Sequence, residues 1–344
     1  MDKLKLAFIG AWGHGQGAVE YFRKETLPEV ELAGLAQTHE QEGCWDLPDS
    51  YDEVPRYENY QQMLTEVKPD LVVVSSKLQY IHQAVLSAAE NGCHVLAEKP
   101  IAASFSELDN LYDAVQRNKG ALLLLLNNRA NPYLKAVKNT VEEGIVGDPV
   151  LVNGRKSYPW NPSRVDNFPI RLGGTIGWVG IHAFDIINGA TNLTFNQAVG
   201  MESNQIFSEY AQCPDNTAMV SELENGGHAT ISLDYHRPKA SSTHGDDWIR
   251  VVGLEGTIEA NLSQQTIHCC TDKQSDRKIT LPETEDYYRQ YFAYLRNGDW
   301  QERFTPMTAL TLHMTAACIT AQEAVQSGTV KEIPAKYKLK SATQ

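Results

Sequence analysis

The sequence has 344 residues, more than one hydrophobic core ordinarily supports, so we expect two domains. Its net charge of −13 argues against a nucleic-acid partner, because binding to phosphates requires clustered Lys and Arg. There is no apolar run of membrane-spanning length and no signal peptide before the first apolar strand, which predicts a cytoplasmic protein that binds no membrane.

The first part of the sequence alternates apolar strand patterns with helical patterns. The expected strands are 4–10, 30–37, 68–76, 94–100 and 121–127, and the expected helices are 15–25, 58–67, 81–92 and 104–118. Ser104 or Ser106 is expected to cap the last of these helices, and Gly92 to end the one before it. Apolar strands joined by helices predict a doubly wound parallel sheet, an α/β Rossmann domain.

The pattern changes after about residue 128. A helix closed by Gly144 and a turn is expected in 132–148, strand-like segments at 149–158, 217–236 and 247–262, and a late helix at 305–328. Asn225-Gly226-Gly227 and Glu255-Gly256 mark hairpin turns. Many strands with few helices predict an α+β domain with a large, open, mostly antiparallel sheet. The sequence thus divides into a nucleotide domain at 1–127 and a substrate and oligomerisation domain at 128–344.

The cysteines are scattered and form no C-x-x-C pair, as expected for free thiols in a reducing cytosol. His268, Cys269 and Cys270 are adjacent and invite comparison with a metal site. Successive residues of a strand point to opposite faces, however, so these side chains cannot easily share one ion. The sequence therefore predicts no metal site.

A glycine-rich segment, FIGAWGHGQG at 8–17, lies between the first expected strand and helix. A dinucleotide pyrophosphate binds at this place, against the N–H groups of a helix N-terminus. The G-x-G-x-x-G spacing is incomplete, because Trp12 replaces the second glycine. The residues expected to contact the cofactor here are Gly10, Trp12, Gly13, His14 and Gly15. The alternative is a turn that only packs the strand against the helix.

The second expected strand ends at Gln37, where an acidic residue ordinarily binds the ribose 2′-hydroxyl. An amide can bind the same hydroxyl and does not repel a 2′-phosphate. Because no Arg lies immediately beside Gln37, the sequence favours NAD and leaves NADP open. Further cofactor contacts are expected from residues at or near other strand ends, which are Ser75, Ser76, Glu98, Lys99 and Asn127.

The strand end HVLAEKPIA, at 94–102, resembles that of the glucose–fructose oxidoreductase / inositol dehydrogenase (Gfo/Idh/MocA) family. Segments 127–154, 173–185 and 251–260 resemble, in order, the family's crossover, active-site helix and late sheet strand. The resemblance implies hydride transfer between a sugar or polyol carbon and a nicotinamide. It also implies a homodimer or homotetramer formed through the C-terminal sheet. Some relatives instead cleave glycosidic bonds with transiently used NAD⁺.

The resemblance implies catalytic roles for Lys99 and His182. An ammonium after a parallel strand can donate to a substrate hydroxyl, and Glu98 is expected to orient the loop of Lys99. His182 is expected as the general acid or base, with a reference pKa of about 6.5. Asp185, one helical turn on, is expected to orient His182 or to contact a substrate hydroxyl. The alternatives are a solvated lysine and a structural histidine.

Trp178 departs from the family pattern, which often has Asp four residues before the histidine. An indole offers a flat apolar surface and one N–H donor, which suits the C–H face of a sugar ring. We therefore expect either a changed mechanism or a different substrate class.

The segment 155–174 has the composition of a substrate-binding loop, with several prolines, arginines and aromatic residues. Tyr158 is a candidate second acid or base, and Trp160 a candidate to stack on a sugar ring. A carboxylate or sugar hydroxyls are expected to be bound by Arg164 and Arg171. An anionic substrate stays open if these two arginines form a ring with Arg155 and Lys156. The alternative is a packed surface loop.

Three functions compete. The first is an NAD(P)-dependent oxidoreductase acting on a sugar or cyclitol, with Lys99 and His182 handling the hydroxyl proton. The second is an NAD-dependent glycoside hydrolase of the same family, which oxidises, eliminates, hydrates and reduces. The third is a non-catalytic regulator that binds nucleotide or sugar, which Trp12, Gln37 and Trp178 would mark as degenerate.

Overall fold

The computed structural model describes residues 3–10, 15–24, 30–38, 53–159, 175–205, 213–283, 286–288 and 300–339. The chain forms two compact units. The first unit contains 1–125 and 286–312, and the second contains 126–285 and 313–344. The sequence predicts a single crossing after residue 127, whereas the chain returns to the first unit at 286–312.

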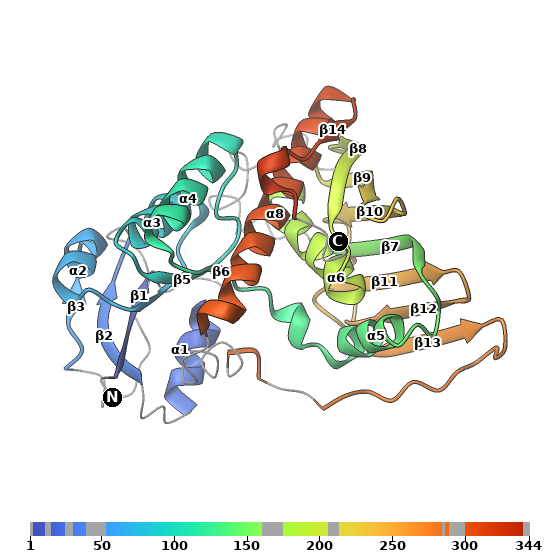
Figure 1. Ribbon diagram of the computed structural model, residues 1–344, viewed down its shortest axis with the longest axis horizontal. Helices are drawn as coiled ribbons and strands as arrows, with labels where there is room; N and C mark the ends of the chain where they lie inside the picture. The colour runs from blue at the N-terminus through green and yellow to red at the C-terminus, as the bar shows by residue number, and fades with distance from the viewer. Residues whose placement is uncertain are drawn as a thin grey trace. The chain divides into compact units, whose positions relative to one another are not determined.

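The first unit is built on a six-stranded parallel sheet in the order β3-β2-β1-β4-β5-β6 (Figure 1). Its strands are β1 (Leu4–Ile9), β2 (Val30–Ala36), β3 (Arg56–Tyr57), β4 (Leu71–Val74), β5 (His94–Ala97) and β6 (Leu122–Leu124). Its helices are α1 (Gly15–Lys24), α2 (Tyr60–Val67), α3 (Leu78–Glu90) and α4 (Phe105–Asn118). The strand order reverses between β1 and β4, which confirms the expected Rossmann fold.

Local sequence accounts for these elements. Strands β4 and β6 consist of Val and Leu only and are buried along their whole length, as expected for a sheet covered on both faces. Helix α4 begins after Ser104, whose hydroxyl accepts a hydrogen bond from the N–H of Glu107 at 3.3 Å. The Glu107 carboxylate accepts one from the N–H of Ala103 at 2.7 Å, so Ser104 is confirmed as the cap.

The second unit is built on an eight-stranded sheet in the order β13-β12-β11-β7-β10-β9-β8-β14 (Figure 1). Its strands are β7 (Pro149–Ser157), β8 (Phe195–Ser203), β9 (Asn216–Leu223), β10 (His228–Asp234), β11 (Asp246–Gly253), β12 (Gly256–Asn261), β13 (Thr266–Thr271) and β14 (Lys331–Glu332). Among the strands that the structure describes in this unit, only β7 and β10 pair in parallel, so the expected mostly antiparallel sheet is confirmed.

Helices α5 (Pro132–Glu142) and α6 (Ile181–Thr191) pack on this sheet, α6 against β7 and β11 and α5 against β12. A single turn of 3₁₀-helix (Asn127–Ala130) precedes α5, and a π turn (Ile176–Gly180) precedes α6. Helix α8 (Trp300–Ser327) contributes to both units. No helix among the described residues is long and apolar enough to cross a bilayer.

The turns and boundaries match the sequence in part. The predicted hairpin between β9 and β10 turns at Gly226, whose φ of +83° favours glycine. As expected, a turn at Gly144 closes the helix: α5 ends at Glu142, and Gly144 and Gly147 take positive φ values. Cys269 is buried and Cys270 exposed, so these neighbours point to opposite faces of β13 as expected.

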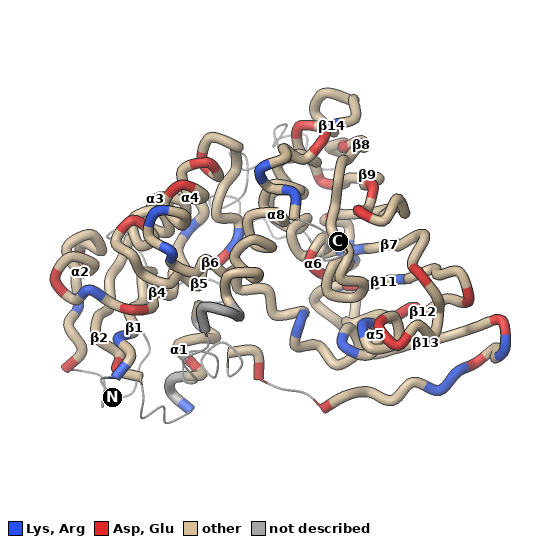
Figure 2. Tube along the Cα trace, viewed as in Figure 1, with Lys and Arg blue, Asp and Glu red and all other residues tan. Residues whose placement is uncertain are grey.

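Acidic and basic residues are interspersed over both units in Figure 2. The pKa values of the buried titratable groups depend more on the fold than those of the exposed ones. His313 on α8 is fully buried; its Nε2 accepts the N–H of Phe195 at 3.1 Å, and its Nδ1 lies 2.9 Å from the carbonyl oxygen of Tyr337. These partners require a neutral ring with the proton on Nδ1. Burial lowers the pKa of His313 below 6.5, although the bond to Tyr337 opposes this.

We expect the free energy of unfolding to decrease as pH falls from 7 towards 5. The unfolded histidine takes up a proton below about pH 6.5, whereas the buried ring resists protonation, so each such group costs up to about 1.4 kcal/mol per pH unit. Urea denaturation across this range measures the slope. His313→Gln should reduce it only in part, because the pKa of His94 is lowered as well, chiefly by burial.

The matched control is His228→Gln, since His228 is exposed on β10. It should leave the slope unchanged. An unchanged slope in His313→Gln would contradict the role given to His313.

Candidate active site

The glycine turn of the first unit is built for a close backbone approach. Gly10 follows β1 with a φ of +77°, and Gly15 begins α1. The N–H of Gly15 donates to the hydroxyl of Ser75 at 3.0 Å, and a Cβ on Gly15 would lie 2.1 Å from the Cβ of Ser75. Only glycine fits there, so Ser75 supports the turn from the end of β4. Trp12, Gly13 and His14 lie outside the described residues.

The ends of β2 and β4 meet beside this turn. Gln37 is half-buried, and its N–H donates to the carbonyl of Tyr57 at 3.3 Å. The hydroxyls of Thr38 and Ser76 are in hydrogen-bond contact, and both Ser75 and Ser76 are fully buried. A glycine turn before a helix N-terminus, with an amide at the end of the next strand, fits the pyrophosphate and ribose of a dinucleotide.

Glu98 and Lys99 directly follow β5, at the carboxyl edge of the parallel sheet. Both side chains are buried, and the Lys99 ammonium lies 3.8 Å from the Glu98 carboxylate. The N–H of Glu98 donates to the carbonyl of Val74 at 2.8 Å, which ties the segment to β4. Lys99 is therefore a desolvated cation held by a carboxylate at the edge where α/β sheets bind ligands.

In the second unit, the segment with Trp178 and His182 begins as a π turn and continues as α6. Single π turns within helices are frequent at functional sites. Trp178 is half-buried in the turn, and His182, the second residue of α6, is buried. The sequence predicts one helical surface for both residues but gives no signal of the π turn.

Asp185 is engaged by an arginine from the 3₁₀ turn. Its Oδ1 lies 2.6 Å from Nε of Arg129, whose Nη2 donates to the side chain of Asn188 at 2.8 Å. Burial raises the pKa of Asp185, while Arg129 and Lys156 act against that rise. The structure thus pairs Asp185 with Arg129. Asn127, in the same 3₁₀ turn, is exposed.

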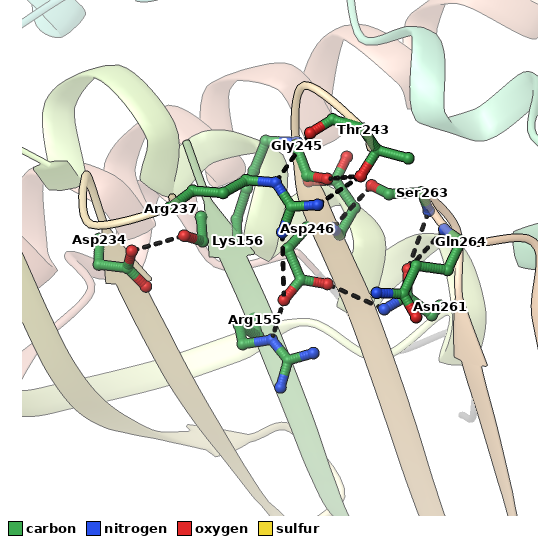
Figure 3. Close-up of polar contacts among 12 residues, drawn as sticks. Arg155, Lys156, Asp234, Arg237, Thr243, Gly245, Asp246, Asn261, Ser263 and Gln264 are labelled. Carbon is green, nitrogen blue, oxygen red and sulfur yellow. Dashed lines mark hydrogen bonds and ion pairs between the residues drawn. The ribbon is translucent and has the colours of Figure 1, made fainter. Parts of the chain in front are cut away.

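Arg155 and Lys156 point to opposite faces of β7, which corrects the hypothesis of one ring of cations. Nε of Arg155 lies 2.9 Å from Oδ2 of Asp246, which Arg237 also approaches, at 3.9 Å (Figure 3). Lys156 is buried on the face of β7 that packs against α6, and its ammonium lies 2.6 Å from Oδ1 of Asp247. Both cations are thus neutralised by carboxylates within the fold.

Tyr158 and Trp178 meet in one apolar cluster. Both pack against Val179 and Tyr235, which are buried. The ring of His244 lies 5.1 Å from that of Tyr158. The remaining residues expected to bind substrate, Trp160, Arg164 and Arg171, lie outside the described residues.

Sequence reasoning missed two polar pairs near Tyr158. One is Lys156 with Asp247, and the other is His236 with Asp215, whose Nε2 and Oδ1 atoms lie 3.1 Å apart. A charged residue at an inward position of an alternating strand is the signal that marks Lys156 as unusual. Its partner follows only from the register of β7 with β11.

Comparison with known families adds a second kind of finding. The model of the NAD-binding Rossmann domain of the Gfo/Idh/MocA oxidoreductases matches 4–125, and that of their C-terminal domain matches 134–259. The chain belongs to the Gfo/Idh/MocA family. Its first unit is therefore an NAD-binding Rossmann domain, and the family resemblance of the sequence is confirmed.

Three curated relatives show which kinds of protein this Gfo/Idh/MocA chain resembles. The uncharacterized oxidoreductase YrbE of Bacillus subtilis is 26% identical, over 60% of each chain. Myo-inositol 2-dehydrogenase of Thermotoga maritima is 24% identical, over 78% of this chain and 79% of the relative. Glycosyl hydrolase family 109 protein 1 of Akkermansia muciniphila is 23% identical over only 46% of this chain and 34% of the relative.

Solved structures agree with the Gfo/Idh/MocA fold. A Thermotoga maritima protein provisionally described as an oxidoreductase is 28% identical, with a TM-score of 0.83 over 96% of this chain and 100% of that chain. An oxidoreductase from Agrobacterium radiobacter in complex with NAD⁺, L-tartaric acid and magnesium has a TM-score of 0.76 at 17% identity, over 96% and 98% of the two chains. The second likeness shows the fold alone.

Proposed function

We propose that this chain oxidises a hydroxyl-bearing carbon of a sugar or cyclitol with NAD. The observation that carries the proposal is the buried Lys99, paired with Glu98 at the carboxyl end of β5 in an NAD-binding Rossmann domain. A buried ammonium at that edge suits a substrate oxygen that gains negative charge. The match to a myo-inositol dehydrogenase supports a carbohydrate substrate.

The first unit supplies the cofactor site. NAD, when bound, provides the hydride acceptor for the oxidation. The turn at Gly10 and Gly15 would hold its pyrophosphate, and Gln37 its ribose, assisted by Ser76. The amide of Gln37 does not exclude a 2′-phosphate, so NADP stays an alternative.

Lys99 and His182 share the proton chemistry in this proposal. The ammonium of Lys99 donates to the substrate hydroxyl and stabilises the alkoxide, while the imidazole of His182 accepts the proton. Arg129 occupies one oxygen of Asp185. Asp185 therefore contributes to this proton chemistry through the electrostatic effect of its carboxylate. Trp178, in place of an acidic residue, offers an indole to the C–H face of the substrate.

We also propose that a second copy of the chain binds the face of the eight-stranded sheet opposite α6. A groove of about 790 Å³ lies there, and among its lining residues Met201 is 80% exposed and Val220 is 40% exposed. Apolar side chains so exposed in a groove are typical of an interface. Light scattering should show a dimer or tetramer, and Met201→Glu with Val220→Glu should dissociate it. A monomeric parent chain would contradict the interface.

One screen tests the function. The protein is incubated with NAD⁺ and a panel of free sugars, cyclitols and glycosides, while NADH absorbance and released sugar are followed together. We expect NADH to accumulate in proportion to oxidised product with at least one free sugar or cyclitol. Absence of NADH with every compound would contradict the proposal.

The hydrolase alternative rests on Trp178 and on the partial match to a family 109 hydrolase. Its signature in the same screen is sugar released from a glycoside without net NADH. The regulator alternative predicts that NAD⁺ raises the melting temperature while no compound is turned over.

A further inference from the structure

Lys156 is a buried cation to which the proposed function gives no role. It is 1% exposed, on the inner face of β7. The strand register places it directly opposite Asp247 of β11, and their charged groups lie 2.6 Å apart. Burying a lysine costs free energy unless its charge is paired, so Asp247 offsets the cost of burying Lys156 at this end of β7.

Tyr158 lies two residues after Lys156 in the sequence, and its ring lies close to the ammonium of Lys156. The ammonium of Lys156 lies 5.0 Å from the centroid of the Tyr158 ring. The backbone of Tyr158 is fixed by its N–H donating to Asp234 at 3.0 Å and by its carbonyl accepting from Arg237 at 3.2 Å. Tyr158 is half-buried as a residue, whereas Lys156 is 1% exposed.

We propose that Lys156 is a positioning residue that stabilises the ionised phenol of Tyr158, and that Tyr158 is a second acid–base group for the substrate. This inference rests on the proposed function. In the oxidation, the O–H bond of a substrate hydroxyl breaks, and its proton passes to the imidazole of His182 and from there to the tyrosinate oxygen. The hydrogen on carbon leaves with its electron pair to the nicotinamide, and the neutral phenol later returns its proton to water.

The charges around Lys156 favour ionisation of Tyr158 rather than loss of the lysine proton. Asp247 and Tyr158 raise the pKa of Lys156, although desolvation opposes them as the largest contribution. A phenol has a reference pKa of about 10, and a cation within about 4–6 Å lowers it by one to three units.

The other groups facing this pair come from several elements. Asp185 of α6 interacts electrostatically with Lys156 and is itself paired with Arg129. The ring of His244 lies 5.1 Å from that of Tyr158, tilted by 37°, and the buried phenol of Tyr235 interacts electrostatically with Tyr158. Among these described groups, the carboxylates of Asp185 and Asp247 balance the cations of Arg129 and Lys156.

The direct test is a titration of Tyr158 in the cofactor-free protein. Carbon-13 NMR of tyrosine Cζ, with the signal assigned by its loss in Tyr158→Phe, gives the pKa of the phenol. We expect a value at least one unit below about 10. A value of 10 or above in the parent protein overturns the inference, whether or not a substrate has been found.

Lys156→Met tests the coupling. The Tyr158 signal should then titrate at least one unit higher, and Lys156→Arg should restore most of the difference. If Lys156→Met does not fold, the titration of Tyr158 in the parent protein decides the inference. The control is Lys138→Met on the surface of α5, which should leave the titration unchanged. An unmoved Tyr158 titration in the folded Lys156 variant overturns the inference.

Kinetics separate this inference from the proposed function. With a substrate in hand, Lys156→Met should lower kcat about 100-fold at pH 7.5, leave KM within about threefold, and move the rising limb of the pH profile to higher pH. Tyr158→Phe should make a further Lys156→Met change silent. Multiplying effects in the double variant would overturn the inference and leave the oxidoreductase intact. If the protein turns over no substrate, the proposed function is wrong. The titration of Tyr158 still tests whether Lys156 stabilises its ionised form.

Discussion

Lys99→Ala should lower kcat by about 10³-fold and change the affinity for NAD⁺ by less than about tenfold. The ammonium is assigned to a charge that develops on the substrate oxygen, so its loss affects the transition state more than the bound ground state. Acid–base and electrostatic groups of this kind contribute about 10²–10⁴-fold. Steady-state kinetics with the substrate from the screen, and calorimetry with NAD⁺, measure the two quantities.

Removing Lys99 also removes the ammonium that lies 3.8 Å from the buried Glu98 carboxylate. Lys99→Ala is therefore compared with Lys99→Ala plus Glu98→Gln, which removes both charges. The control is Lys24→Ala, since the side chain of Lys24 is 71% exposed on α1. Turnover near the parent rate in either Lys99 variant would end the catalytic assignment.

Arg129→Met should lower the free energy of unfolding by about 3 kcal/mol, because it leaves Asp185 buried without its nearest cation. The side chain of Asp185 is 1% exposed and that of Arg129, 2.6 Å away, is 32% exposed, so solvent screens the pair only from the side of Arg129. Urea denaturation measures the change. The double variant with Asp185→Asn should recover part of the loss, because the remaining amide carries no charge.

A matched surface pair is the control for this measurement. Arg117 and Glu90 lie 3.7 Å apart with side chains 66% and 49% exposed, and Arg117→Met should cost less than about 1 kcal/mol. Equal losses in Arg117→Met and Arg129→Met would show that burial of Asp185 is not the cause.

The sequence was sufficient for the fold because its signals are local. The apolar strand of β4, the Ser104 cap and the turn at Gly226 each act within a few residues, and all three are found where the patterns predict them. The return of 286–312 to the first unit has no local signal. It depends on contacts far apart in the sequence, such as the hydroxyl of Tyr287 donating to the carbonyl of Leu124 at 2.9 Å.

The candidate site was predictable only in part, for the same reason. Lys99 and His182 sit in recognisable segments, and their roles stay proposals. The pairing of Lys156 with Asp247 joins residues of two strands distant in the sequence and needs the β7–β11 register. The partner of Asp185 was equally hidden, because Arg129 reaches it from the 3₁₀ turn before α5.

The most direct test of the central claim is isotopic. A sugar or cyclitol that the protein oxidises is prepared with deuterium on its hydroxyl-bearing carbons and incubated with NAD⁺. The account predicts that each NADH formed carries one deuterium, detected by mass spectrometry. Sugar released with no net NADH, or NADH without deuterium, would contradict oxidation by hydride transfer from a carbohydrate carbon.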